Sequence, residues 1–167
     1  NYLKKINNKN VDIIVSLSKL SFKNDRFAYY KKIKEFTQKL KKKLNINIYP
    51  QWLPVKAWYF GGCVDTLAFS NPADLIFLKN INLPICLDIS HYILSCNFYK
   101  INIEKYFQQS SKIFKHYHFS DASGFDGEGV MFGEGDLVKS GILSAVLKDK
   151  KKIKVLETWQ GHLDNCY

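Results

Sequence analysis

The sequence predicts an α/β fold, a partial (β/α)8 TIM barrel of about five βα units with parallel strands. Apolar strand-like runs alternate with helical runs, and the strand ends recur at intervals of roughly one βα unit. Polar clusters also follow the last three strands directly. Functional side chains gather at the carboxyl ends of strands in a barrel, whereas an open doubly wound sheet more often concentrates its site at one switch point. Both architectures fit the alternation, and the repeated clusters favour the barrel.

The first half of the chain predicts two strands and two helices. The β-branched run at residues 11–15 is typical of a strand. Apolar side chains recur every three or four positions across residues 26–44, which predicts an amphipathic helix with Asp25 as its N-cap. A second strand is expected at residues 46–49, and a helix with proline in its first turn at residues 72–78.

The second half of the chain predicts three further strands, at residues 83–87, 115–119 and 153–156. Helical runs at residues 103–114 and 137–147 separate these strands. All five predicted strands are largely apolar, as expected when both faces of a parallel sheet are covered.

The length of the chain limits how much of a barrel it can form. Its 167 residues suffice for one domain with its own core, so we expect residues 1–167 to form a single partial barrel domain. A complete (β/α)8 barrel needs about 250 residues. We therefore expect that N-terminal units are missing, and that an N-terminal barrel half or a fused synthase module completes the protein.

Composition excludes several classes of protein. Hydrophobic residues make up 46% of the chain, which excludes a disordered protein. No apolar run is long enough to span a membrane and no secretory signal is present, so we expect a cytoplasmic protein without a membrane partner. The four cysteines form no CxxC pair, which indicates reduced, mostly buried thiols.

The net charge of +10 comes almost entirely from lysine, because Arg26 is the only arginine. The lysines cluster in residues 39–43 and 148–154, which are typical of a helix end and a loop. A solvated basic surface explains them, so we expect no nucleic-acid partner, and a phosphorylated substrate is a secondary alternative. The absence of a GxGxxG or Walker motif also disfavours a nucleotide-binding sheet.

Two polar residues follow the third predicted strand. Asp88 ends this strand, and His91 comes one helical turn later. Carboxylate and imidazole groups are common ligands of divalent metals, so Asp88 is a candidate metal ligand and His91 a candidate catalytic or substrate-binding group. The alternative is a capping Asp88 and a surface His91, which would explain this cluster better if it stood alone.

A second cluster follows the fourth strand. His116 and His118 are two positions apart, so they share a face, and Asp121 comes next as a candidate substrate-binding group. We expect one of the histidines to point into the barrel mouth, and the alternative is a pair of core histidines. A glycine-rich acidic loop follows. One interpretation is that it brings Asp126 and Glu128 to a metal or to sugar hydroxyls, and the equal alternative is that it is a flexible acidic turn.

The third cluster begins with Glu157 at the end of the last strand. A carboxylate there is costly to bury unless it is paired or bound to a metal, which favours a functional role. Trp159 and His162 follow as candidate substrate-binding groups. Three consecutive strand ends that carry Asp, His and Glu predict one divalent metal site.

Several runs of the sequence together resemble the xylose isomerase-like barrel superfamily, which includes sugar isomerases, epimerases and the apurinic endonucleases. The matching runs are LDISH, HFSDASGFDGEGVMFGEGD and LETWQGH. The run WYFGG followed by LPICLDISHY is similar to the sugar isomerase/epimerase branch of surface-polysaccharide pathways. The resemblance extends from Val11 to the end of the sequence and matches the last five strands of the barrel.

The resemblance implies a metal held by a Glu, an Asp, a His and a Glu from four successive strands. Asp88, His118 and Glu157 match three of these positions, and His91 matches a histidine that touches the substrate. Gln51 stands where the family carries the first Glu. Its carbonyl oxygen can coordinate weakly, but it cannot take a proton. The metal stays open among Mn²⁺, Mg²⁺, Co²⁺ and Zn²⁺.

The resemblance therefore implies a metal-dependent sugar or sugar-phosphate isomerase or epimerase that acts by enediolate proton transfer, with Glu157 and His91 as catalytic residues. Surface-polysaccharide biosynthesis is the expected setting. Because Gln51 removes one acid/base group, the alternative is an accessory sugar-binding barrel without catalysis. A third hypothesis is an apurinic-endonuclease-like phosphodiesterase. The run Asp126-Gly127-Glu128 argues against it, because that branch carries Asp-x-His in this loop.

Overall fold

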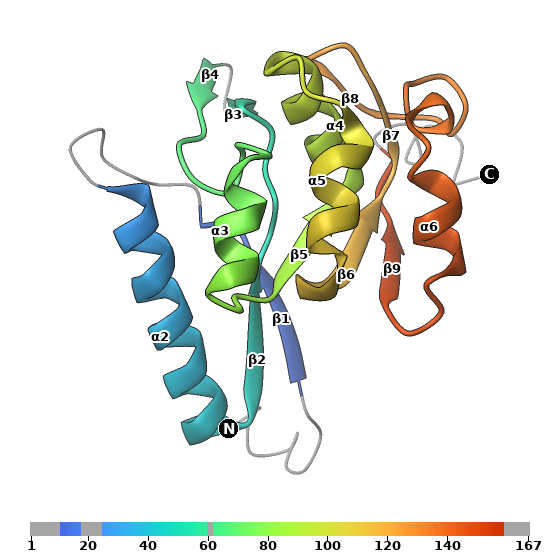
Figure 1. Ribbon diagram of the computed structural model, residues 1–167. Helices are drawn as coiled ribbons and strands as arrows, with labels where there is room; N and C mark the ends of the chain where they lie inside the picture. The colour runs from blue at the N-terminus through green and yellow to red at the C-terminus, as the bar shows by residue number, and fades with distance from the viewer. Residues whose placement is uncertain (1–10, 18–24, 60–61, 159–167) are drawn as a thin grey trace.

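The computed structural model describes residues 11–17, 25–59 and 62–158, and within them five parallel strands form an arc (Figure 1). These strands are β1 (Val11–Val15), β2 (Ile46–Pro50), β5 (Ile85–Asp88), β6 (Phe114–Phe119) and β9 (Ile153–Leu156). β1 pairs with β2, and β6 lies between β5 and β9. A parallel bridge between Gln51 and Cys86 joins β2 to β5. The predicted partial barrel of parallel strands is confirmed, and the described strands do not close into a ring.

The helices lie where the sequence predicts them, with one addition. They are α2 (Arg26–Leu44), α3 (Asp74–Asn80), α4 (Ile89–Phe98), α5 (Ile103–Ser110) and α6 (Leu143–Lys148), with short 3-10 turns at Ser111–Ile113 and Val138–Ser140. Helix α4 directly follows Asp88 and was not predicted. The run expected at residues 137–147 breaks at Gly141, whose φ of 77° is left-handed. None of the described helices has the length and apolar character needed to cross a bilayer.

Two antiparallel hairpins interrupt the βα alternation. β3 (Lys56–Tyr59) pairs with β4 (Gly62–Asp65), and β7 (Asp121–Ser123) pairs with β8 (Gly127–Val130). Both are short, and the sequence pattern did not reveal them. The β7–β8 hairpin follows β6 and packs against α4, so it lies next to the carboxyl ends of β5 and β6.

The parallel sheet is curled strongly enough to bring β1 opposite β6. In a flat sheet, three strand spacings would separate these strands by about 14 Å. Asp12 Oδ2 on β1 nevertheless lies 2.8 Å from His116 Nε2 on β6. Asn47 on β2 donates to the other carboxylate oxygen of Asp12 at 2.7 Å. Side chains can meet in this way only across the concave face of an arc, which excludes the open doubly wound alternative.

The hydrophobic core lies between the strands and the helices. Helix α2 contacts this core through Tyr30, which is fully buried. Its hydroxyl donates to Asp74 Oδ2 at 2.8 Å and accepts from the Phe69 N–H at 3.0 Å. Arg26 pairs with the same Asp74 oxygen at 2.8 Å. A polar network thus fastens α2 to α3 inside an otherwise apolar layer.

Replacing Tyr30 by Phe should lower the free energy of unfolding by about 1–3 kcal/mol, because the buried Asp74 carboxylate and Phe69 N–H each lose a partner. Urea denaturation followed by circular dichroism measures the change. Tyr29→Phe on the same helix is the matched control, since among the described residues its hydroxyl has a long, 3.4 Å hydrogen bond to the Leu17 carbonyl. Equal losses in the two variants would contradict the assigned role of the network.

Candidate metal centre

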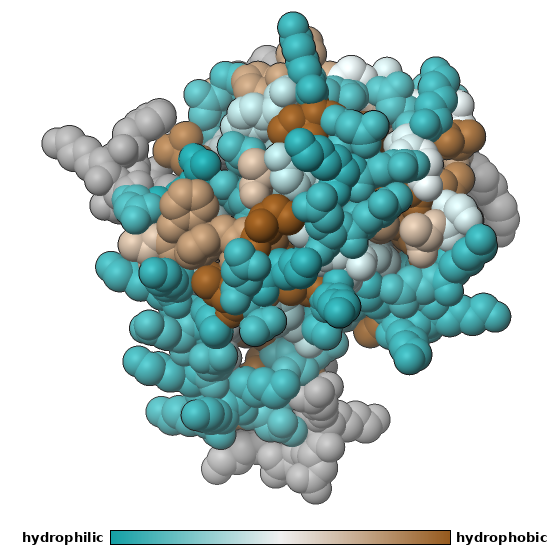
Figure 2. Space-filling model, in the orientation of Figure 1, coloured by the Kyte–Doolittle hydropathy of each residue, from teal (hydrophilic) through white to brown (hydrophobic). Residues whose placement is uncertain are grey.

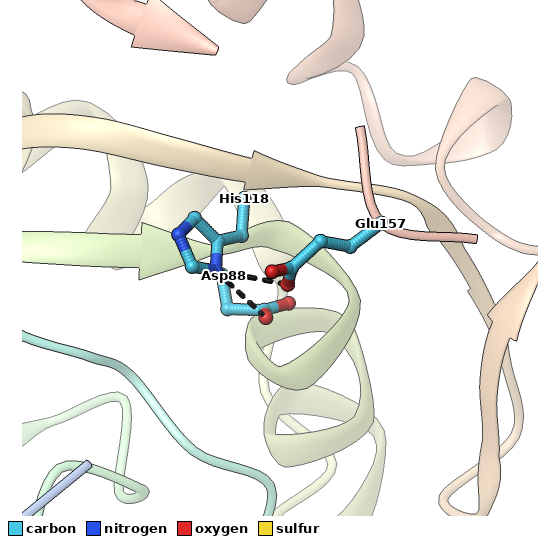
Figure 3. Close-up of side chains that lie close together, drawn as sticks. All are labelled: Asp88, His118 and Glu157. Atoms are coloured by element: carbon cyan, nitrogen blue, oxygen red, sulfur yellow. Dashed lines mark ion pairs between the residues drawn. The ribbon is translucent and has the colours of Figure 1, made fainter. Parts of the chain in front are cut away.

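Asp88, His118 and Glu157 point toward one another at the carboxyl ends of β5, β6 and β9 (Figure 3). One ligand atom from each lies within 4.8 Å of the other two. Strand register causes this convergence, because Asp88 is paired with His118 and His118 with Val155, which shares a face with Glu157. His118 Nδ1 lies 2.9 Å from Glu157 Oε2 and 4.0 Å from Asp88 Oδ2.

The two carboxylate oxygens of Asp88 have different roles, one at the N-terminus of α4 and one at the candidate metal centre. Its Oδ1 accepts from the His91 backbone N–H at 3.1 Å and so caps α4, while Oδ2 faces His118. Burial raises the pKa of Asp88, and the nearby Glu157 raises it further, whereas His91 and Gln51 lower it. A cation at this point would favour the ionised carboxylate. The capping and ligand interpretations of Asp88 are therefore compatible.

Gln51 occupies the position that the resemblance assigns to the fourth ligand. Its Nε2 donates to Asp88 Oδ2 at 3.0 Å and lies 3.1 Å from His118 Nδ1. Its Oε1 accepts from the Ser16 hydroxyl at 3.3 Å. The amide therefore presents its NH₂ group, and not its oxygen, to the centre. A half-turn of the amide would present the carbonyl oxygen.

The donor set fits a divalent metal. His118 Nδ1 faces a carboxylate, which requires a ring N–H, and also the NH₂ group of Gln51, which requires a ring lone pair. One nitrogen cannot meet both demands. A neutral imidazole and two carboxylates that share a cation would resolve the conflict, because each would contribute a lone pair.

His91 lies beside the centre and is held on both ring nitrogens. Nδ1 lies 2.9 Å from the Trp52 carbonyl and 3.2 Å from Asp88 Oδ2, and Nε2 lies 2.6 Å from Glu128 Oε1. Burial lowers the pKa of His91, but Asp88, Glu128 and the Trp52 carbonyl together raise it to about 9. The resulting imidazolium ties the β7–β8 hairpin to Asp88. Direct contact of His91 or Glu128 with a substrate stays a prediction.

Asp121 holds a loop. It is fully buried, and its two oxygens accept from four backbone N–H groups, those of Ala122, Gly133, Gly135 and Leu137, at 2.8–3.1 Å. Carboxylate oxygens used in this way are turned to the backbone and away from a bound molecule. The predicted substrate contact of Asp121 therefore gains no support from its surroundings.

The remaining predicted site residues lie apart from the triad or outside the described residues. Asp126 is exposed in the turn of the β7–β8 hairpin. Trp159 and His162 lie outside the described residues. His116 is not part of the triad and pairs with Asp12 deeper in the arc. The contribution of Asp12 was missed, because a single Asp in a β-branched run does not show which strand it will face.

Comparison with known proteins supports the fold. No protein-family model matches the chain, and no curated protein does. Among solved structures, the probable 3-DHS dehydratase AsbF of Bacillus anthracis, involved in petrobactin synthesis, is 21% identical with a TM-score of 0.58, over 90% of this chain and 58% of that one. A D-tagatose 3-epimerase-like protein is 16% identical with a TM-score of 0.57, over 92% and 58%.

Both solved structures match nearly the whole of this chain at TM-scores above 0.5. At these identities the likeness shows the fold alone, and it confirms the barrel architecture that the sequence resemblance implies. The chain spans 58% of the length of each of these two proteins.

We expect the chain to bind a divalent metal through the triad, with Mn²⁺ and Co²⁺ as the probes. In isothermal titration calorimetry, His118→Ala and Glu157→Gln should each weaken metal binding about tenfold or more. Removing a residue that only orients a ligand already costs about that much affinity, and removing the ligand itself costs at least as much. Asp88→Asn should act in the same way and keep the helix cap. Glu35→Gln, an exposed change on α2, is the control and should bind as the parent does. Unchanged affinity in all three triad variants would refute the centre.

Proposed function

We propose that this chain carries the metal centre of a sugar or sugar-phosphate isomerase or epimerase. The convergence of Asp88, His118 and Glu157 at the carboxyl ends of three neighbouring strands carries this proposal. In barrels of this kind, that end is where chemistry takes place. The likeness to a D-tagatose 3-epimerase-like protein and to a probable dehydratase supports an enzyme that acts on a small oxygen-rich molecule.

Asp88, His118 and Glu157 would hold the metal, with the Gln51 carbonyl oxygen as a weak fourth ligand. When bound, a divalent metal polarises a substrate carbonyl and acidifies the neighbouring C–H. Glu157 is the carboxylate that a substrate can reach, since 46% of its side chain is exposed against 5% for Asp88. We therefore assign to Glu157 the transfer of the proton between neighbouring carbons.

The amide at Gln51 affects whether the site favours isomerisation or epimerisation of a sugar. Inversion at one carbon needs acid/base groups on both faces of the substrate, and an amide cannot supply the second. Transfer by one carboxylate suffices for isomerisation between neighbouring carbons. The arrangement therefore supports an isomerase over an epimerase. His91 acts on this chemistry by holding Asp88 and Glu128, and its direct catalytic role remains part of the proposal.

We also propose that further βα units complete the ring. Among the described strands, β1 and β9 lie at the two ends of the arc and each has a neighbour on one side only. Three more strands would bring the five to eight. We propose an N-terminal barrel half as their source, with a fused synthase module as the alternative partner and residues 1–167 as one partial domain. Buried, unpaired Cys86 and Cys96 suit the reducing cytoplasm, which we propose as the location.

One contact favours an accessory sugar-binding barrel as a second candidate. The Gln51 NH₂ group lies against Asp88 and His118, so an uncharged hydrogen-bond donor stands where the resemblance places a carboxylate. Such a site keeps the geometry of a metal centre but loses one negative charge. Weak metal binding without turnover is the expected behaviour of this alternative.

Glu157→Gln should abolish the metal-dependent activity of the completed protein, because the amide can accept no proton. Exchange of substrate C–H for deuterium, followed by proton NMR over a panel of ketohexoses and their phosphates in D₂O with Mn²⁺, measures the proton transfer itself. Glu35→Gln controls for the loss of a surface charge. Full exchange in Glu157→Gln would refute the assignment.

Gln51→Glu should raise the affinity for Mn²⁺ about tenfold, since a charged ligand replaces an amide at the same place. A parallel gain in exchange at the substrate C–H would identify the chain as an enzyme weakened by this one residue. A gain in affinity without exchange would support the accessory barrel. Unchanged or weaker metal binding would show that position 51 is not part of the centre.

A further inference from the structure

A second site lies at the opposite ends of the strands from the metal centre. A cavity of about 230 Å³ opens between α2, β2 and the start of β6. Its lining includes Asn47 on β2, which is four residues before Gln51 and hence about 13 Å from it along the strand. The cavity and the metal centre are therefore distinct.

The cavity exists because the sheet splits. β2 is bonded to β5 only near Gln51, through the bridge to Cys86 and the bond from the Trp52 N–H to the Cys86 carbonyl at 2.9 Å. β5 begins at Ile85, one residue before Cys86, so β2 from Ile46 to Tyr49 has no β5 strand beside it. Pro84, which lines the cavity, has no N–H with which to extend the ladder toward β2. The wedge between the strands is thus a built feature of the fold.

Positive charge converges on this wedge. Lys34 and Lys41 reach it from one face of α2, where Thr37 and Gln38 also line it, and Lys115 reaches it from β6. Hydrophilic side chains also dominate the surface along α2 (Figure 2). The described residues that line the wedge include no Asp or Glu. Asp12 accepts a hydrogen bond from the lining residue Asn47 and also contacts His116.

Three like charges around a hollow repel one another more than the same charges spread over a convex surface. An anion in the hollow would offset this repulsion, and the amide groups of Gln38 and Asn82 add neutral donors. We propose that the wedge binds a small phosphorylated anion, in the size range from inorganic phosphate to a sugar monophosphate. A polynucleotide is disfavoured, because it needs an extended basic track rather than a small hollow.

Occupation of the wedge would connect α2 and β2 to β5 and β6 across the split. A ligand that binds the folded state alone stabilises it, and the gain grows with the logarithm of the ligand concentration once that concentration exceeds Kd. The site therefore predicts stabilisation by phosphate that is independent of the metal centre, and the inference goes beyond the proposed function.

The test titrates inorganic phosphate, pyrophosphate and glucose 6-phosphate into the metal-free chain at constant ionic strength, with calorimetry and thermal unfolding as readouts. Saturable binding of at least one probe is expected. Lys34→Gln and Lys115→Gln should each weaken it about tenfold, as expected for the loss of one charge-assisted contact. Lys39→Gln is the matched control, since it removes the same charge from α2 at a position outside the lining.

Circular dichroism of each variant shows whether it folds, and the conservative Lys34→Arg and Lys115→Arg variants should retain binding because they keep the charge. The proposal is overturned if no probe binds saturably, or if Lys39→Gln weakens binding as much as the wedge variants do. Tighter binding of a DNA duplex than of any small phosphate, lost equally in all three glutamine variants, would show a diffuse basic surface and would also overturn it.

Discussion

The rest of the structure depends on the curl of the parallel sheet, and the contact between Asp12 and His116 shows this curl directly. The two residues belong to strands that are separated by two others, yet their side chains meet at 2.8 Å. The same curl lets Gln51 on one strand reach His118 two strands away, at 3.1 Å. A flat sheet would keep all of these groups parallel and apart.

The centre that results is electrostatically costly without a cation. Asp88 is nearly fully buried, Glu157 lies close by, and both face one imidazole. The imidazolium of His91 offsets part of this negative charge from the side of Trp52 and Glu128. A divalent ion would offset the remainder and would stabilise the ionised form of the buried Asp88 carboxylate, whereas Glu157 is exposed.

The same arc is interrupted in two ways that have different consequences. Among the described strands, β1 and β9 lie at its two ends and each pairs on one side only. Its interior split between β2 and β5 instead produces the lysine-lined wedge. Composition alone explains the lysines as a solvated surface. The split in the sheet brings three of them, Lys34, Lys41 and Lys115, around one cavity.

The sequence by itself determined the alternation of strands and helices and three metal-ligand candidates. Local periodicity and the Asp25 cap suffice for residues 26–44, and any residue that ends a parallel strand shares an edge with its neighbours. Helix α4 escaped prediction because its residues from Ile89 to Cys96 are all buried, which leaves no polar face to reveal a helical period. Only the tertiary structure decided between an open sheet and a barrel, because the contact of Asp12 with His116 joins residues that are 104 positions apart in the chain. Such a contact cannot be predicted from the local sequence pattern, because it depends on the curvature of the sheet and not on the amino-acid sequence of either strand alone.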